Sequence, residues 1–174
     1  MQIEKIIRKL YGIPCWGVRP GLGSFLTLEF GKPHLVIREP VVAAKSTPVI
    51  VRKSLARRRV YVHGDWHLWI YCCDWVVFSG HSHVGDSSAR MKIRKAAEFL
   101  NGQKLTHFSI SVRKASCMFK FDLGGILKTM PHDSESRQWL LYEPSQKVLS
   151  VRADGHYQYV PSDLPEDHGE WKRL

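Results

Sequence analysis

Four histidines and an aspartate lie close together in the sequence, at a spacing that could bind a metal ion. Residues 63–67 are His-Gly-Asp-Trp-His. On a continuous strand, alternate residues face one side, so two imidazoles and a carboxylate would converge. His81 and His83 follow in the next loop with the same alternate spacing. The candidate ligands are His63, Asp65, His67, His81 and His83, with Asp74 as a second carboxylate.

Two features of the same stretch oppose a metal site. It contains no established ligand spacing such as His-Glu-x-x-His. In addition, Gly64-Asp65 is typical of a turn, which would point the flanking histidines in different directions. The sequence therefore favours surface histidines beside a hairpin, and we expect neither a bound metal nor a cofactor.

A basic stretch gives the chain its strongest charge signal. Lys and Arg number 26 against 16 Asp and Glu, a formal net charge of +10. Residues 1–85 hold 12 of the basic and 5 of the acidic side chains, so most of the excess lies in the first half. Guanidinium groups pair well with carboxylates and phosphates. The predicted binding residues are Arg52, Lys53, Arg57, Arg58 and Arg59, with Trp66 as an exposed aromatic anchor.

No set of side chains in the sequence makes a convincing catalytic site. Cys72 and Cys73 lie in an apolar stretch, which indicates buried reduced thiols rather than a nucleophile activated by His81. Glu29 and Asp122 each stand two residues before a glycine, on the polar face of an expected strand. We assign them to turns rather than to an acid–base pair. No catalytic residue is predicted, and the chain is expected to be non-enzymatic.

The pattern of apolar residues predicts two helices, each followed by antiparallel strands. Residues 2–11 and about 89–101 carry an apolar stripe at the helical period, and each ends in Leu-x-Gly. Strict alternation then predicts strands at 24–30 and 117–123, with one apolar face and one face in water. Shorter strands follow in both halves, including a possible one at 49–52.

The order of these features predicts an α+β fold with an internal duplication. We expect two tandem α-then-antiparallel-β repeats, each a helix plus about four strands, forming one domain with pseudo-twofold symmetry. The halves are 1–85 and 86–160 of a single domain, 1–160. A basic insertion at about 39–64 interrupts the first half, and residues 161–174 form a peripheral acidic tail.

Composition places the chain among folded proteins and suggests a cytoplasmic location. Apolar residues make up 44% and charged residues 24%, which argues against disorder. The N-terminus lacks the apolar core of a signal peptide, and the most apolar window is too short to span a bilayer.

Three functions remain open on the sequence. The first is a small intracellular binding protein, of an immunity or adaptor type, that engages an acidic partner through its basic first half. The alternative is a nucleic-acid-associated protein that uses the Arg-rich loop. The third is a metal-binding protein or hydrolase that uses His63, His67, His81 and His83.

Overall fold

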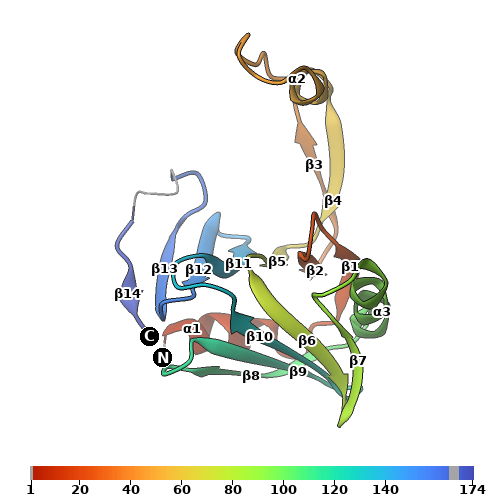
Figure 1. The fold of residues 1–174 in the computed structure, drawn as a ribbon, viewed down its shortest axis with the longest axis vertical. Coiled ribbons are helices and arrows are strands. Elements are labelled where there is room, and N and C mark those ends of the chain that lie inside the picture. The colour runs from red at the N-terminus through yellow and green to blue at the C-terminus, as the bar shows by residue number, and fades with distance from the viewer. Residues whose placement is uncertain (1, 165–168) are drawn as a thin grey trace.

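The computed structural model shows two antiparallel sheets packed face to face and a long arm that projects from them (Figure 1). It describes residues 2–164 and 169–174. Strands account for 48% of the chain and helices for 16%. The apolar faces of the two sheets enclose one core, whose largest fully buried side chains include Trp75, Trp139, Phe30 and Phe119.

The first sheet has seven strands and carries the arm. Its strands follow the order β1 (Cys15–Pro20), β2 (Leu26–Phe30), β5 (Trp66–Ile70), β11 (Arg137–Glu143), β12 (Lys147–Arg152), β13 (His156–Pro161) and β14 (Lys172–Arg173). In β2, Leu26, Leu28 and Phe30 point into the core and alternate with Thr27 and Glu29 on the outer face.

The second sheet has five strands and covers the other side of the core. Its order is β7 (Ser82–Asp86), β6 (Cys73–Ser79), β10 (Gly125–Pro131), β9 (Ser116–Phe121) and β8 (Leu105–Ser111). Phe108 and Phe119 of this sheet meet Trp139 of the first sheet, with ring centroids 5.9 and 5.8 Å from the tryptophan ring. This aromatic contact ties the two sheets together.

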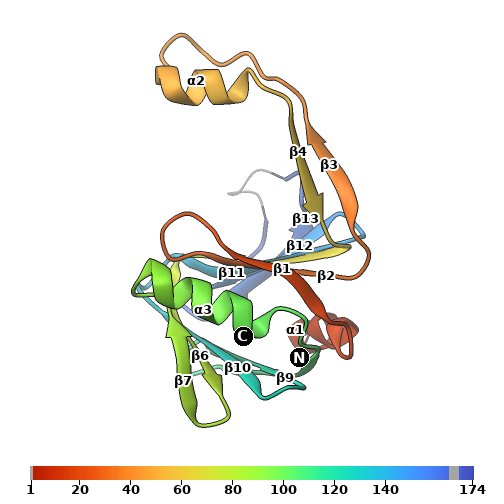
Figure 2. The same ribbon diagram turned by 90° about the vertical axis from the view of Figure 1, so that its right-hand side faces the viewer.

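Two helices stand at the open edges between the sheets. α1 (Gln2–Ile7) continues into a 3₁₀ turn, η1 (Arg8–Leu10), and both lie against β8. α3 (Arg90–Leu100) packs between β1 of one sheet and β7 of the other (Figure 2). The apolar stripe of α3, which includes Ile93, Ala97 and Leu100, is buried in the core. The amphipathic pattern of both helical segments is therefore used for packing.

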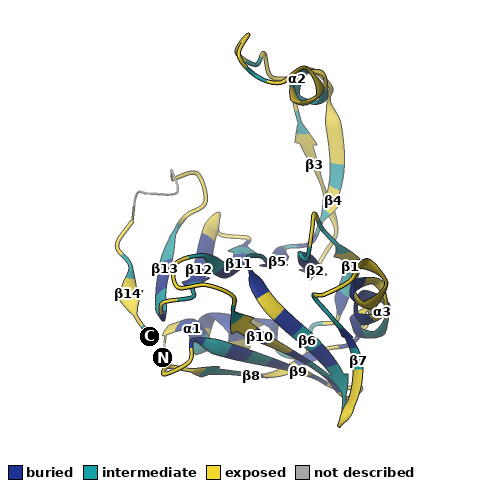
Figure 3. Cartoon of the chain, viewed as in Figure 1, coloured by how far each residue is buried: buried dark blue, intermediate teal, exposed yellow. Residues whose placement is uncertain are grey.

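The arm consists of residues 34–63 and extends away from the two sheets. β3 (His34–Arg38) and β4 (Arg59–His63) form a two-stranded ribbon, and α2 (Val49–Leu55) lies at its tip. Most of the arm is exposed (Figure 3). None of its side chains belongs to the core cluster of the described residues.

The predicted α+β fold with two tandem repeats is wrong. The chain is mainly β, with three sheets and short helices, and it does not divide into two units of a helix plus four strands. Strands from both halves are interlaced: β5 pairs with β11, and β6 pairs with β10. Helix stripes and Leu-x-Gly ends are local signals, which cannot specify the partner that a strand finds far along the chain.

The structure also places three local segments that the sequence analysis singled out. The β-branched run at 49–52 favours a strand, but these residues begin α2. Pro48 is the N-cap of this helix, and proline is well tolerated at the start of a helix. No described strand lies beside residues 49–52 to pair with them. Residues 39–64, predicted as a basic insertion, include α2 and β4. Of the predicted acidic tail at 161–174, residues 165–168 lie outside the described residues, and β14 pairs with β13.

We predict that the arm can be removed without unfolding the two sheets. His34 and His63 are paired across the base of the ribbon. Replacing residues 35–62 by Asn-Gly would therefore join these two residues by a two-residue hairpin turn. Urea unfolding should give a free energy of unfolding within about 1 kcal/mol of the intact chain, because the arm contributes nothing to the core. As a control, Trp139→Ala should cost about 3–5 kcal/mol. Loss of cooperative unfolding in the shortened chain would contradict this view of the arm.

Candidate functional site

A buried carboxylate at the base of the arm brings two histidines together. Glu29, on the outer face of β2, is 0% exposed. Its Oε1 atom accepts hydrogen bonds from Nδ1 of His67 at 2.8 Å and from Nδ1 of His63 at 3.0 Å. Its Oε2 atom accepts the backbone N–H of Gly64 at 3.0 Å. Since the carboxylate can only accept, both imidazoles carry their proton on Nδ1 in this arrangement.

Sheet register and one glycine create this convergence. Glu29 and His67 are direct cross-strand neighbours in the β2–β5 pair. The link between β4 and β5 then folds over the end of β2, and a side chain at Gly64 would place its Cβ 2.3 Å from the carbonyl oxygen of Phe30. Glycine is therefore required there. The link is also held by the Asp65 carboxylate, which accepts the Lys32 N–H at 2.8 Å.

The surroundings of Glu29 favour its charged form. Burial raises the pKa of this carboxyl, but the hydrogen bond and charge of His67, the N–H of Gly64 and the charge of His63 together hold it below its ordinary value of 4.5. The Arg19 guanidinium lies 3.5 Å from Oε1 and adds a further positive charge. Glu29 is thus an ionised carboxylate in contact with donors on three sides.

The histidine cluster opens into a pocket of about 810 Å³ beneath the arm. Its lining comes from β3, β4, β5, β11, the links that follow β4 and β11, the first residue of β12, and Ser162. The lining includes His34, Val36, His63, His67, Trp69 and Tyr142. Since the side chains of His63 and His67 are 26% and 16% exposed, a small ligand in this pocket could reach both imidazoles.

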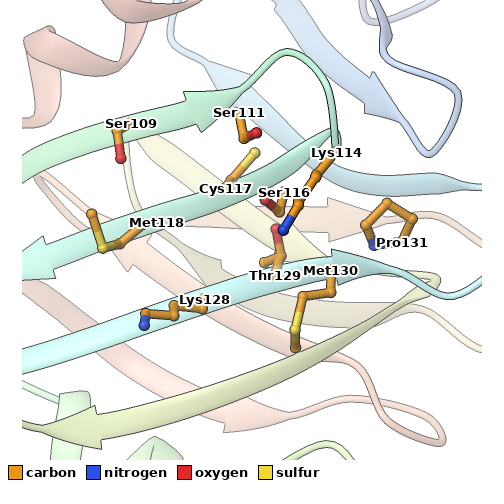
Figure 4. A pocket seen from close by; sticks show the side chains of 10 residues that line it. All are labelled: Ser109, Ser111, Lys114, Ser116, Cys117, Met118, Lys128, Thr129, Met130 and Pro131. Carbon is orange, nitrogen blue, oxygen red and sulfur yellow. The ribbon is translucent and has the colours of Figure 1, made fainter. Parts of the chain in front are cut away.

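A second hollow, of about 460 Å³, lies over the five-stranded sheet (Figure 4). Side chains of β8, β9 and β10 line it, mostly serine, lysine and methionine. It contains Cys117, but burial raises the pKa of this thiol to about 12, so the thiolate needed for nucleophilic chemistry does not form near neutral pH. We find no catalytic grouping in this hollow among the described residues.

The structure joins only part of the predicted histidine cluster. His63 and His67 meet, but through Glu29, which the sequence assigned to a turn. His83 pairs instead with Asp86 at 3.0 Å, and His81 lies at the tip of the β6–β7 hairpin. The sequence did contain a signal for Glu29, which is the only charged residue of β2. The strand and link that supply its partners are not apparent from the sequence.

The predicted basic residues lie together at the far end of the arm. Arg52 and Lys53 are on α2, Arg57 and Arg58 follow it, and Arg59 begins β4. Arg58 is paired with Glu39 at 2.8 Å, and Arg59 donates to Ser54. Within the described part of the chain, we find no hydrogen bond or ion pair made by the side chains of three of the cations: Arg52, Lys53 and Arg57.

The predicted aromatic anchor does not lie with these cations. Trp66 is on β5, 9% exposed, and packs in the core with Lys9 above its ring. Because β5 alternates, its outward tryptophan is Trp69, which lines the pocket at the base of the arm. Trp66 therefore cannot anchor a partner in this conformation.

An exposed apolar face on the arm was missed by the sequence analysis. Cross-strand partners on a ribbon share a face, so Leu35 and Val62 lie beside Ile37 and Val60. These four side chains are 66%, 45%, 54% and 56% exposed, respectively. Further exposed apolar side chains of the arm are Val36, Val41, Val42, Val49, Ile50 and Val51. The sequence signal for this face was the apolar residue at every second position, at 35 and 37 and again at 60 and 62.

Two further predictions concern the thiols and membrane spans. All four cysteines are free, and Cys15, Cys73 and Cys117 are buried, as expected for structural thiols; Cys72, also expected to be buried, is only half-buried. Among the described residues, no helix is both long and apolar enough to cross a bilayer.

Comparison of the chain with protein-family models, with curated proteins and with solved structures finds no match in any of the three. Function must therefore be argued from the arm and from the cluster at its base.

We predict that Glu29→Gln destabilises the protein in a pH-dependent way. A glutamine would lose the charge-assisted hydrogen bonds from both imidazoles, at a cost of about 2 kcal/mol at pH 7. The folded state lowers the pKa of Glu29 below 4.5, so its stabilising effect is complete above that pH and is lost as the pH falls through the folded-state pKa.

Urea unfolding of both chains at neutral and acidic pH tests this expectation. The difference in the free energy of unfolding should shrink below pH 4.5, the ordinary pKa of Glu29. Asp74→Asn is a matched control, since Asp74 is an exposed carboxylate paired with His132. A difference that does not change with pH would show that the charge of Glu29 is not what stabilises the cluster.

Proposed function

We propose that the chain is a non-enzymatic binding protein whose arm engages an acidic partner protein. The observation that carries this proposal is the combination of an exposed apolar ribbon and a cationic tip on one projecting element. Protein interfaces commonly have an apolar centre and a charged rim. The arm provides both without the two sheets having to change shape.

The charge of the arm supports an acidic partner. Residues 34–63 contain seven Lys and Arg but one acid, Glu39, so the arm carries a net charge of +6 out of the formal +10 of the whole chain. Near the tip, the side chains of Arg52, Lys53 and Arg57 have no intrachain partner in the described structure. A carboxylate-rich surface would satisfy them and speed association.

The apolar face favours a protein over a nucleic acid. Ten of the sixteen large apolar side chains that are exposed among the described residues belong to the arm. Nucleic-acid interfaces are more polar and depend mainly on phosphate contacts, and a groove of DNA or RNA offers little to a ribbon face of leucine, isoleucine and valine. A protein groove would remove that face from water.

The proposal includes a cytoplasmic location. It is supported by the four free cysteines, three of them buried, because such thiols persist most readily in a reducing compartment.

The partner can be captured through the arm itself. A photo-crosslinking amino acid at Val60 should join the chain to an acidic protein in source cells. The same group at Leu123, which is 70% exposed on the body, should not. Capture at both positions, or of a basic protein, would count against the proposal.

We predict that arm substitutions weaken binding of the purified partner in two distinguishable ways. Leu35→Ser with Val60→Ser should raise Kd more than about tenfold at both low and high salt, because it removes the apolar contact. Arg57→Glu should raise Kd mainly at low salt, because the contact it removes is electrostatic and is screened by ions. Isothermal titration at two salt concentrations measures both effects.

Leu123→Ser and Arg94→Glu are matched controls on the body and should leave Kd unchanged. Fluorescence anisotropy with random-sequence DNA and RNA tests the alternative. The alternative would hold if the natural chain binds nucleic acid, Arg57→Glu abolishes that binding, and the Leu35→Ser, Val60→Ser chain retains it. The partner would then be a nucleic acid and not an acidic protein.

A further inference from the structure

We propose that Glu29, His63 and His67 form a binding site for one divalent first-row transition cation, with Zn²⁺ as the best fit. The ligand atoms are Oε1 of the carboxylate and Nδ1 of each imidazole, which all lie within 4.8 Å of one another. Water from the pocket would complete a tetrahedral shell. This site does not depend on the partner proposed for the arm.

The distances are close to those that a metal requires. Ligand atoms about 2.1 Å from Zn²⁺ in a tetrahedron are about 3.4 Å apart. Nδ1 of His67 and of His63 are already 2.8 and 3.0 Å from Oε1. The Nδ1 atoms therefore need to move away from Oε1 by less than about 1 Å to admit an ion.

Binding of a cation would replace the two hydrogen bonds between the imidazole Nδ1 atoms and Oε1 by coordination. With a cation bound, Nδ1 of each imidazole is the ligand atom and the ring carries its proton on Nε2. Oε2 of Glu29 keeps its hydrogen bond from the Gly64 N–H, which orients the carboxylate for binding through Oε1 alone. One carboxylate and two neutral imidazoles are a donor set that zinc commonly accepts.

Charged side chains near the site would both oppose and favour a bound cation. The Arg19 guanidinium lies 3.5 Å from Oε1 and opposes a cation, but its side chain is 47% exposed and can turn outward into water. The Asp65 carboxylate lines the same pocket and favours a cation there, although it is already held by the Lys32 N–H. Glu143 and Lys147 also line the pocket and carry opposite charges. The attraction for a dication comes from the ionised Glu29 carboxylate itself.

The elements that supply the ligands give this site a structural consequence. Glu29 is on β2, His67 on β5, and His63 is the last residue of β4. A bound ion would therefore fasten the base of the arm to the outer face of the seven-stranded sheet. The arm would be held more rigidly when the site is filled.

Metal binding can be measured on the tag-free full chain after treatment with a chelator. Titration calorimetry with Zn²⁺ should give one ion per chain with Kd below about 10 µM. Co²⁺ in place of Zn²⁺ should give the intense visible absorption of a four-coordinate ion. Zn²⁺ should also raise the Tm of the chain, since it binds only the folded site.

Four variants separate this site from adventitious binding to surface histidines. His63→Gln and His67→Gln should each weaken binding more than about tenfold. The double variant His81→Gln, His83→Gln should bind Zn²⁺ as the natural chain does. The chain with Asn-Gly in place of residues 35–62 retains all three ligands and should also bind.

The proposal is overturned if fewer than one Zn²⁺ binds per chain, or if His63→Gln and His67→Gln bind as tightly as the natural chain. Circular dichroism of each variant shows whether a lost site reflects a lost ligand or a lost fold. His63→Gln carries the decision if His67→Gln unfolds, because His63 lies at the end of β4, outside the seven-stranded sheet.

Discussion

The arrangement at the base of the arm depends on one buried carboxylate that has to be satisfied. An ionised Glu29 without donors would be strongly destabilising at 0% exposure. The donors come from a neighbouring strand and from the link that enters it, namely His67, His63 and the Gly64 N–H. Satisfying Glu29 therefore fixes where the chain leaves the arm and returns to the sheet.

The arm, in contrast, gains little from the body beyond this base. Its two strands pair only with each other, and a two-stranded ribbon is marginal in water. It nevertheless exposes the apolar quartet Leu35, Ile37, Val60 and Val62. Keeping such a face in water costs free energy that a bound partner would recover. On our proposal the body is the scaffold and the arm is the binding element.

The sequence predicted local structure better than the arrangement of strands. Alternation at 26–30 correctly indicated a strand, but its outer face was expected in water, and Glu29 is fully buried there. The link through Gly64 covers that face, and nothing in β2 itself encodes the covering segment. For the same reason, His63 and His67 were recognised as candidate ligands while their shared partner was missed. The sequence marked residues 39–64 as irregular and basic, whereas the ribbon and its apolar face depend on pairing between distant residues.

The most direct test of the central claim, that Glu29 organises the base of the arm, is the protonation of the two imidazoles. Long-range ¹H–¹⁵N NMR spectra of the metal-free chain distinguish the two tautomers of a neutral histidine. Hydrogen bonds to Oε1 require His63 and His67 to carry the proton on Nδ1. Spectra that show Nδ1–H for both residues would support this role of Glu29. Spectra that show Nε2–H for both in the absence of metal would contradict it.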